Sequence, residues 1–403
     1  MFAAVEGLRA LGALSVATSH SWPNAIKNLS WFPGSFLVVE MFFVLSGYLV
    51  TKAYAERVAD WRDAGALVIK RLGRLYPLHL AVLIVWILLF YGKQMANWIL
   101  LLLGVDLGMT PASQQQPFDA GYLLLNLFML HGIGIQDSLA YNYPAWSISV
   151  DFWSFVIVVG LFTLAPQRPV RIVLALAGLS MCALHAAHTW WSIGMPSEQA
   201  TPMMFKVLTR GASAYFIGML AFEWQRNRRL PESEILHTAL QLTCMALLLV
   251  VVPNQQVLPF NQFYACAIWA VLIVSMSEGR GLVAALLSCP ALVWLGQRSF
   301  SMYMTHALLL MLFQRRLMAI DDVTLSTVML FIYLGAAIVL AHLSHWLIEE
   351  RGYAPFLALA RRLQATRPRA ASPRQVAMTY QALAGFGAIQ PWGRSASAGS
   401  HPW

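Results

Sequence analysis

The chain has 403 residues, of which 59% are hydrophobic and only 11% are charged. Soluble domains carry about 25% charged residues, so this composition excludes an ordinary soluble fold and indicates a polytopic membrane protein. The net charge of +9 does not indicate a nucleic-acid partner, because the basic residues cluster in short segments between apolar runs, as in cytoplasmic loops. The four cysteines have neither disulfide nor metal-ligand spacing, and we expect no metal site.

Apolar runs recur along the chain, and a helix needs about 20 mostly apolar residues to cross a bilayer. They predict an all-α bundle with about ten transmembrane helices. The candidate spans cover residues 8–22, 35–54, 75–92, 146–165, 171–191, 204–224, 236–252, 261–278, 299–317 and 325–347. A further run, 121–135, is short and interrupted by Asn126 and His131. We expect this run and the preceding 96–105 to be re-entrant or interfacial helices on the outer side.

The distribution of lysine and arginine predicts the orientation of these spans. With ten spans and a cytoplasmic N-terminus, 21 of the 27 basic residues fall on the inner side, as the positive-inside rule requires. We therefore expect both chain ends in the cytoplasm and the protein in a bacterial inner membrane. Residues 1–351 form the predicted transmembrane domain. Residues 352–403 are rich in Arg, Ala, Ser and Gly, and predict a largely disordered cytoplasmic tail.

Ionisable residues inside apolar runs are functional candidates, because a charge in hydrocarbon costs a few kcal/mol or more. Arg9 and His20 are eleven residues apart, so their side chains share one helix face about 16 Å apart along the axis. A neutral imidazole suits a general base, although a buried structural histidine is an equally good interpretation of this spacing. Arg71 and Arg74 are three residues apart before the third span, as in a phosphate-binding pair or an ordinary membrane anchor.

Further polar residues border the other spans. Glu40 opens the second span and either orients His20 or is a solvated charge at a helix start. Asp151 lies one turn after Ser147 and follows the interfacial Trp146. A polar stripe runs through Ser299, Tyr303 and His306, and serves either function or helix packing. Arg210 is isolated near the outer end of the sixth span, and its role stays open.

Several of these segments, taken in order, resemble the membrane-bound acyltransferase 3 family. The matching segments are Glu6 to Ala10 with His20, Glu40 to Tyr48, Lys70 to Pro77, Trp146 to Asp151, and Leu295-Gly296 with Ser299 to His306. The resemblance covers about residues 5–351. Two positions depart from the family pattern, which usually has Glu where Asp151 stands and often Asp where Glu40 stands.

The resemblance implies an O-acyltransferase that moves an acyl group, often acetyl, from cytoplasmic acyl-CoA to a hydroxyl of a glycan, another cell-surface molecule or a small molecule. It implies catalytic roles for His20, Arg9, Glu40 and Asp151. It implies binding of the acyl-CoA co-substrate by Arg71, Arg74, Ser299, Tyr303 and His306. Some members are fused to a hydrolase-like domain, which we do not expect here. We therefore expect one protein to complete the transfer or to pass the group on.

A transporter or flippase of a polar or lipid-linked solute is the alternative, because it also requires charges inside the membrane. Two features favour the enzyme: an Arg-x-x-Arg pair at the inner mouth aligned with a histidine half-way across, and the lack of a clear internal repeat. The acceptor, the acyl chain length and the oligomeric state do not follow from the sequence.

The first prediction concerns orientation. Topology reporters fused after Lys27 and at the C-terminus should report opposite sides of the membrane, because ten spans place the first loop outside and the tail inside. Fusions to a phosphatase and to a fluorescent protein measure this directly. Reports from the same side would contradict the ten-span arrangement.

Overall fold

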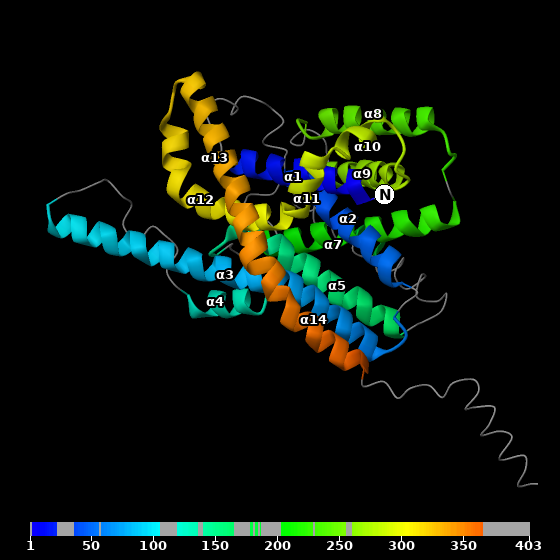
Figure 1. Cartoon of the computed structure of the whole chain (residues 1–403), viewed down its shortest axis with the longest axis horizontal. Helices are drawn as coiled ribbons and strands as arrows, with labels where there is room; N and C mark the ends of the chain where they lie inside the picture. Colours follow the sequence, from blue (N-terminus) through cyan, green and yellow to red (C-terminus); the bar gives the residue numbers. More distant parts are fainter. Residues whose placement is uncertain are drawn as a thin grey trace, which may run out of the picture.

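A computed structural model describes residues 2–21, 36–55, 58–104, 119–135, 140–164, 203–228, 230–254 and 260–365, with a few residues between 178 and 186. Within these ranges the secondary structure is helical and contains no strand, which confirms the predicted all-α class. Figure 1 shows the helices crossing one another around α1, α2 and α12, with α3, α5 and α14 side by side below them.

The elements follow one another in this order: α1 (Phe2–Ser21), α2 (Phe36–Tyr54), α3 (Trp61–Leu102), α4 (Ala120–Leu127), the 3-10 turn η3 (Tyr143–Ala145), α5 (Trp146–Leu164), α7 (Met203–Asn227), α8 (Glu234–Val251), α9 (Asn261–Ser277), α10 (Leu282–Leu287), α11 (Pro290–Gln297), α12 (Ser299–Ala319), α13 (Val323–Ser344), the π-helical turn η5 (His345–Glu349) and α14 (Glu350–Ala365).

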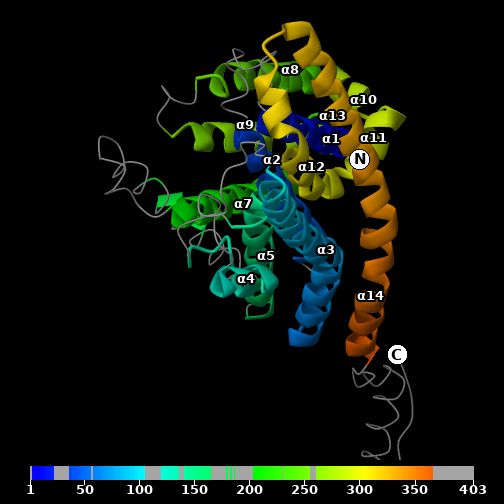
Figure 2. The same ribbon diagram turned by 90° about the vertical axis from the view of Figure 1, so that its left-hand side faces the viewer.

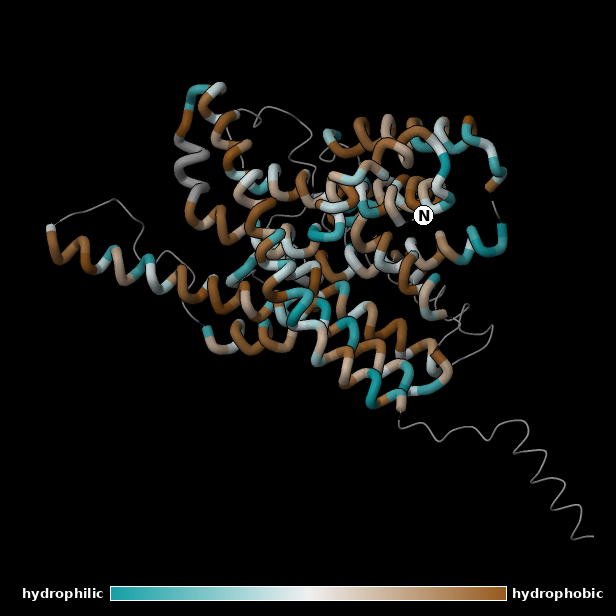
Figure 3. Tube along the Cα trace, viewed as in Figure 1, coloured by the Kyte–Doolittle hydropathy of each residue, from teal (hydrophilic) through white to brown (hydrophobic). Residues whose placement is uncertain are grey.

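Several of these helices are long and apolar enough to cross a membrane. Five such segments occur in the described residues: Leu37–Tyr54, Trp61–Leu102, Tyr143–Thr163, Glu234–Val251 and Val323–Ala365. Two shorter apolar helices accompany them, Asn261–Ser277 and Ser299–Leu312. In Figure 3, α8 and α13 are largely hydrophobic, whereas α14 alternates between hydrophobic and hydrophilic segments. The protein is therefore an integral membrane protein, and the number of ten spans stays a prediction. The predicted span 171–191 lies mostly outside the described residues.

Helix α3 differs from the prediction of a span at 75–92 followed by a separate interfacial helix at 96–105. It is one helix of 42 residues, about 63 Å long at 1.5 Å per residue. Gly92 does not interrupt it, and the helix ends just before Gly104, which has a positive φ of 76°. The separate helix was a wrong prediction because nothing between the two segments stops helix propagation. Helix α4 has only eight residues, too few to cross a bilayer.

Helix α14 continues the chain past residue 351 and packs antiparallel to the first half of α3 (Figures 1 and 2). Three close approaches define the register. A Cβ atom added at Gly65 would lie 3.2 Å from Leu363, one at Gly73 would lie 2.3 Å from Phe356, and one at Gly352 would lie 2.5 Å from Pro77. Residues 350–365 are thus part of the helical body, and the rest of the predicted tail lies outside the described residues.

Helices α2 and α7 cross with their backbones in contact. A Cβ atom at Gly47 would lie 1.8 Å from the carbonyl oxygen of Tyr215, and one at Gly218 would lie 1.9 Å from that of Val44. Small residues permit such close packing, which is common between membrane helices. The crossing holds Tyr48 and Tyr215 fully buried and fixes α2, which carries one wall of the cavity described below.

The second prediction tests this crossing. Gly218→Ala should destabilise the protein by about 3 kcal/mol, because a methyl group would overlap a backbone atom that cannot move aside easily. Thermal unfolding of the purified protein in detergent measures the loss. Gly160→Ala on α5 is the matched control, since nothing lies within 4 Å of its added Cβ atom. Equal stability of the two variants would contradict the close crossing.

Candidate active site

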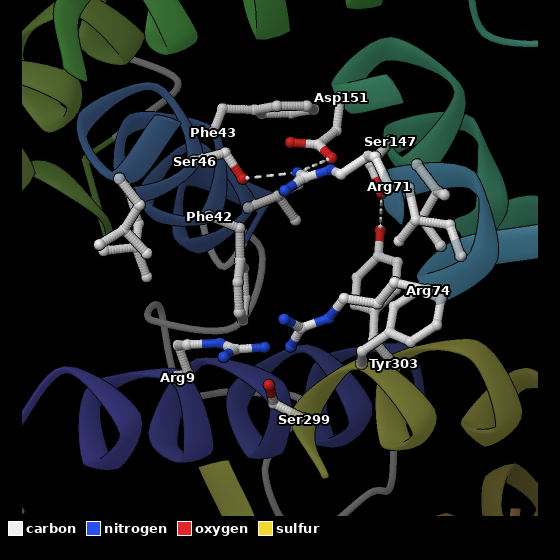
Figure 4. A pocket seen from close by; sticks show the side chains of 16 residues that line it. Arg9, Phe42, Phe43, Ser46, Arg71, Arg74, Ser147, Asp151, Ser299 and Tyr303 are labelled. Atoms are coloured by element: carbon white, nitrogen blue, oxygen red, sulfur yellow. Dashed lines mark hydrogen bonds and ion pairs between the residues drawn. The ribbon is translucent and has the colours of Figure 1, made fainter. Parts of the chain in front are cut away.

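A cavity of about 170 Å³ lies between α1, α2, α3, α5 and α12 (Figure 4). Its polar lining residues are Arg9, Ser46, Arg71, Arg74, Ser147, Asp151, Ser299 and Tyr303, and the rest of the lining is apolar. Six of the nine predicted site residues therefore border one space, although they come from four helices distant in the sequence. The other three, His20, Glu40 and His306, do not line it.

Arg71 and Asp151 form an ion pair that joins α3 to α5. The Arg71 guanidinium also lies 3.4 Å from the Ser46 hydroxyl and 5.2 Å from the ring centroid of Phe155. Both charged side chains are mostly buried, with 22% and 15% of their surface exposed. Removing one partner of a buried pair is costly, so Asp151 holds Arg71 in place and neutralises its charge.

Arg9 and Arg74 have a different environment. Their guanidinium groups point toward each other across the cavity in Figure 4. Arg9 is paired 3.1 Å from Glu6, one turn earlier on α1. Among the described residues, Arg74 has no ion-pair partner. Two guanidinium groups that face each other repel, and an anion placed between them would relieve this repulsion.

A second cavity, of about 520 Å³, shares Arg9, Arg71 and Arg74 with the first. Its lining adds Lys70 on α3, Glu349 at the end of η5, and Glu350 and Tyr353 at the start of α14. Two of these acidic groups have partners of their own: Glu349 accepts from the Ser301 hydroxyl at 2.8 Å, and both Glu349 and Glu350 contact His345. The three arginines thus lie at the junction of a small inner cavity and a larger one beside α14.

His20 lies about 16 Å from Arg9 along α1 and contacts a second histidine. Its Nδ1 is 3.0 Å from Nε2 of His306 on α12, and the two rings are inclined by only 10°. The edge of Tyr143 packs against His20, with ring centroids 5.1 Å apart. His20 is half-buried, whereas His306 is fully buried. The structure therefore brings together two residues that the sequence assigned to separate roles.

Tyr303 connects the arginine cavity with the histidine pair. Its ring lines the cavity, and its backbone carbonyl oxygen lies 2.7 Å from Nδ1 of His306. Its hydroxyl contacts the Ser147 hydroxyl at 2.8 Å and donates to the Pro144 carbonyl at 3.0 Å. These bonds fix Tyr303 against the start of α5. Ser299, one turn earlier on α12, faces the Arg9 side of the same cavity (Figure 4).

Glu40 does not contact His20, and it is not solvated, so both sequence interpretations of this residue were wrong. It is fully buried, and its Oε1 lies 2.6 Å from Nε of Arg210 on α7. Arg210 also lies 5.2 Å from the ring centroid of Trp146. Arg210 is therefore not isolated. The two residues are 170 positions apart, so no local spacing could reveal that they pair across α2 and α7.

Sequence reasoning missed a second pair of histidines with parallel rings, His79 and His131. Their ring centroids are 5.5 Å apart and their planes differ by 2°. His79 also lies 2.9 Å from the carbonyl oxygen of Asn126 at the end of α4. This cluster anchors the segment after α4 to α3. Its residues have no recognisable spacing in the sequence. Among the described residues, no three His, Cys, Asp or Glu side chains come together as a metal site.

Residues 2–346 match the model of the acyltransferase 3 family, which is described as an acyltransferase domain. This chain belongs to that family. The match runs from α1 to the end of α13 and into η5, and it contains all nine predicted site residues. No solved structure matches the chain.

Three named O-acetyltransferases or putative O-acetyltransferases are similar to most of the chain. A putative peptidoglycan O-acetyltransferase, YrhL of Bacillus subtilis, is 26% identical over 329 residues, which are 75% of this chain and 47% of that protein. The peptidoglycan O-acetyltransferase OatA of Listeria monocytogenes is 24% identical over 75% of this chain and 48% of its own length. A putative O-acetyltransferase of Staphylococcus aureus is 23% identical over 86% of this chain and 56% of its own length. The chain spans about half the length of these relatives.

Proposed function

We propose that this protein is an integral-membrane O-acetyltransferase that takes an acyl group, normally acetyl, from cytoplasmic acyl-CoA. The acceptor is a hydroxyl of a glycan such as peptidoglycan. The observation that carries the proposal is the arginine junction between two cavities, linked through Tyr303 to the His20–His306 pair. The names of the relatives support acetyl as the group and a cell-wall glycan as the acceptor.

The donor site is the space between Arg9 and Arg74. Guanidinium groups bind phosphates through charge-assisted and often bidentate hydrogen bonds, and CoA carries several phosphates. The larger cavity beside α14 offers about 520 Å³ for the nucleotide end of such a donor. Arg71 takes a supporting role in this proposal, because Asp151 already neutralises it. The donor pair in this proposal is therefore Arg9 with Arg74. The family resemblance implied Arg71 with Arg74 instead.

The transfer takes place at His20. From Arg9 the acyl end of the donor extends about 16 Å along α1, past Tyr303, to reach this histidine. His20 then either removes the proton of the acceptor hydroxyl, whose oxygen attacks the thioester carbon, or carries the acyl group on its ring nitrogen. In both routes the carbon–sulfur bond breaks, and the thiolate of CoA leaves with a proton.

The ion pairs Arg71–Asp151 and Arg210–Glu40 have positioning roles in this proposal. The first joins α3 to α5, which both carry lining residues of the cavity. The second joins α2, which also carries lining residues, to α7. Asp151 and Glu40 each neutralise an arginine in these pairs, so neither carboxylate is the base that acts on the acceptor in this proposal. A transporter is the weaker candidate, because it has no need of a phosphate-binding arginine pair linked to a single histidine centre.

The third prediction concerns the donor. Arg74→Ala should weaken binding of CoA about ten- to one hundred-fold, the effect of one charge-assisted hydrogen bond worth about 1.5–3 kcal/mol. Isothermal titration calorimetry on the detergent-purified protein measures the Kd. Arg62→Ala is the control, since Arg62 is on the same helix, over Trp61, and lines neither cavity. An unchanged Kd in the Arg74 variant would contradict donor binding by Arg74 and would favour its interpretation as a membrane anchor.

The fourth prediction concerns the catalytic centre. His20→Ala and His20→Gln should both abolish acetyl transfer while binding CoA as the wild type does, because neither side chain has a titratable nitrogen. Transfer is measured by mass spectrometry of O-acetyl groups on glycans of cells that express each variant. His342→Ala, a change to an exposed histidine that bonds to Arg298, is the control. Near wild-type transfer by either His20 variant would make His20 a packing residue.

A further inference from the structure

His306 has no access to a ligand, although it contacts the proposed catalytic histidine. It is 0% exposed, and both of its ring nitrogens have partners inside the protein. Its Nδ1 faces the Tyr303 carbonyl, and its Nε2 faces His20. A residue enclosed in this way does not contact the donor, so we do not assign His306 the donor-binding role that the family resemblance implied.

The partners of the two rings assign their tautomers. A carbonyl oxygen only accepts hydrogen bonds, so the Nδ1 of His306, 2.7 Å from the Tyr303 oxygen, must carry the proton. A neutral imidazole has one N–H, so the Nε2 of His306 is an acceptor. The Nδ1 of His20, 3.0 Å away, is then the donor, and its Nε2 keeps a lone pair. The 10° angle between the rings suits this bond, because the nitrogen lone pair lies in the ring plane.

We propose that His306 is a positioning residue that holds His20 as the Nδ1–H tautomer, which makes Nε2 of His20 the reacting atom. This inference rests on the proposed function of His20 and adds the identity of its reacting nitrogen. The relay runs from His20 to His306 and ends on the backbone carbonyl of Tyr303, whose ring lines the donor cavity. The acceptor of the orienting bond is thus a neutral histidine rather than a carboxylate.

The arrangement serves the whole reaction cycle. When Nε2 of His20 takes the proton from the acceptor hydroxyl, an N–H bond forms there as the O–H bond breaks. The resulting imidazolium still donates its Nδ1–H to His306, so the ring does not have to reorient. The hydroxyl oxygen attacks the acyl carbon, the carbon–sulfur bond breaks, and the proton passes from Nε2 to the CoA thiolate. If Nε2 carries the acyl group instead, the Nδ1–H bond holds the ring in the same way.

The alternative tautomer would remove this function. With the proton on Nε2, the Nδ1 of His20 would face the Nε2 lone pair of His306, so two acceptors would oppose each other without a proton between them. In triads of serine proteases, a change that leaves the geometry intact but selects the wrong histidine tautomer lowers kcat by about 10⁴. A neutral partner stabilises an imidazolium less than a carboxylate does, so we expect a smaller effect here.

Two measurements test the proposal. In the first, nitrogen-15 NMR of histidine-labelled protein in lipid, compared with the His20→Ala variant, identifies the His20 tautomer without any need for activity. In the second, kcat and the KM for acetyl-CoA are measured for His306→Leu and His306→Gln in proteoliposomes with an acceptor glycan. Gln keeps an acceptor oxygen near the place of Nε2, whereas Leu has a similar size and no acceptor.

We expect the Nδ1–H form of His20, a kcat about one hundred-fold lower in His306→Leu with KM unchanged, and at least one-tenth of wild-type kcat in His306→Gln. An Nε2–H signal from wild-type His20 would overturn the proposal. Equal kcat in the two His306 variants, whether high or low, would also overturn it, because the acceptor atom would then not matter. If wild-type protein transfers nothing while the Nδ1–H form is found, the proposed function fails and the tautomer assignment stands.

Discussion

Ionic groups inside an apolar helix bundle are stable only when other groups of the protein compensate their charge, and this constraint organises the structure. Arg71 with Asp151 joins α3 to α5, and Arg210 with Glu40 joins α7 to α2. These four helices enclose or support the arginine cavity. Each pair is costly to break, because it would leave one buried charge without its partner. The pairs therefore fix the helices in one arrangement.

The facing guanidinium groups of Arg9 and Arg74 depart from this rule. The charge of Arg9 is balanced by Glu6 on its own helix, whereas that of Arg74 has no ion-pair partner in the described part of the chain. The protein uses its other buried charges to hold helices together, so positive charge directed into a cavity calls for a different explanation. An anionic ligand that enters and leaves supplies one, since a permanent partner would block the site.

The sequence predicted the general character of the fold well, because composition and apolar run length depend on local residues alone. It also placed Arg9 and His20 on one face of the first helix, which follows from helix geometry. It failed where the answer depended on distant residues. Arg71 and Arg74 share a local motif, yet one binds Asp151 and the other faces Arg9. Nothing in the spacing distinguishes them, because Asp151 comes from another helix, 80 residues along the chain.

The polar stripe on α12 illustrates the same limit more sharply. The helical period predicted correctly that Ser299, Tyr303 and His306 lie along one side, but it could not tell what each would meet. Helix α12 packs against α1, so successive turns of α12 meet successive levels of α1. Ser299 faces the level of Arg9, and His306 reaches the level of His20. Tyr303 lies between them and contacts both the arginine cavity and the histidine pair.

The packing of α12 along α1 has a chemical consequence. The donor end and the reacting end of the proposed path are separated by about three turns of α1. A single helix, α12, borders both ends. The ring of Tyr303 on this helix lines the donor end, and its backbone carbonyl contacts His306 at the reacting end. Tyr303 therefore borders the proposed donor site with its ring and supports the proposed reacting histidine through His306 with its backbone. Because both contacts belong to one residue, the position of α12 along α1 sets the donor end and the reacting end together.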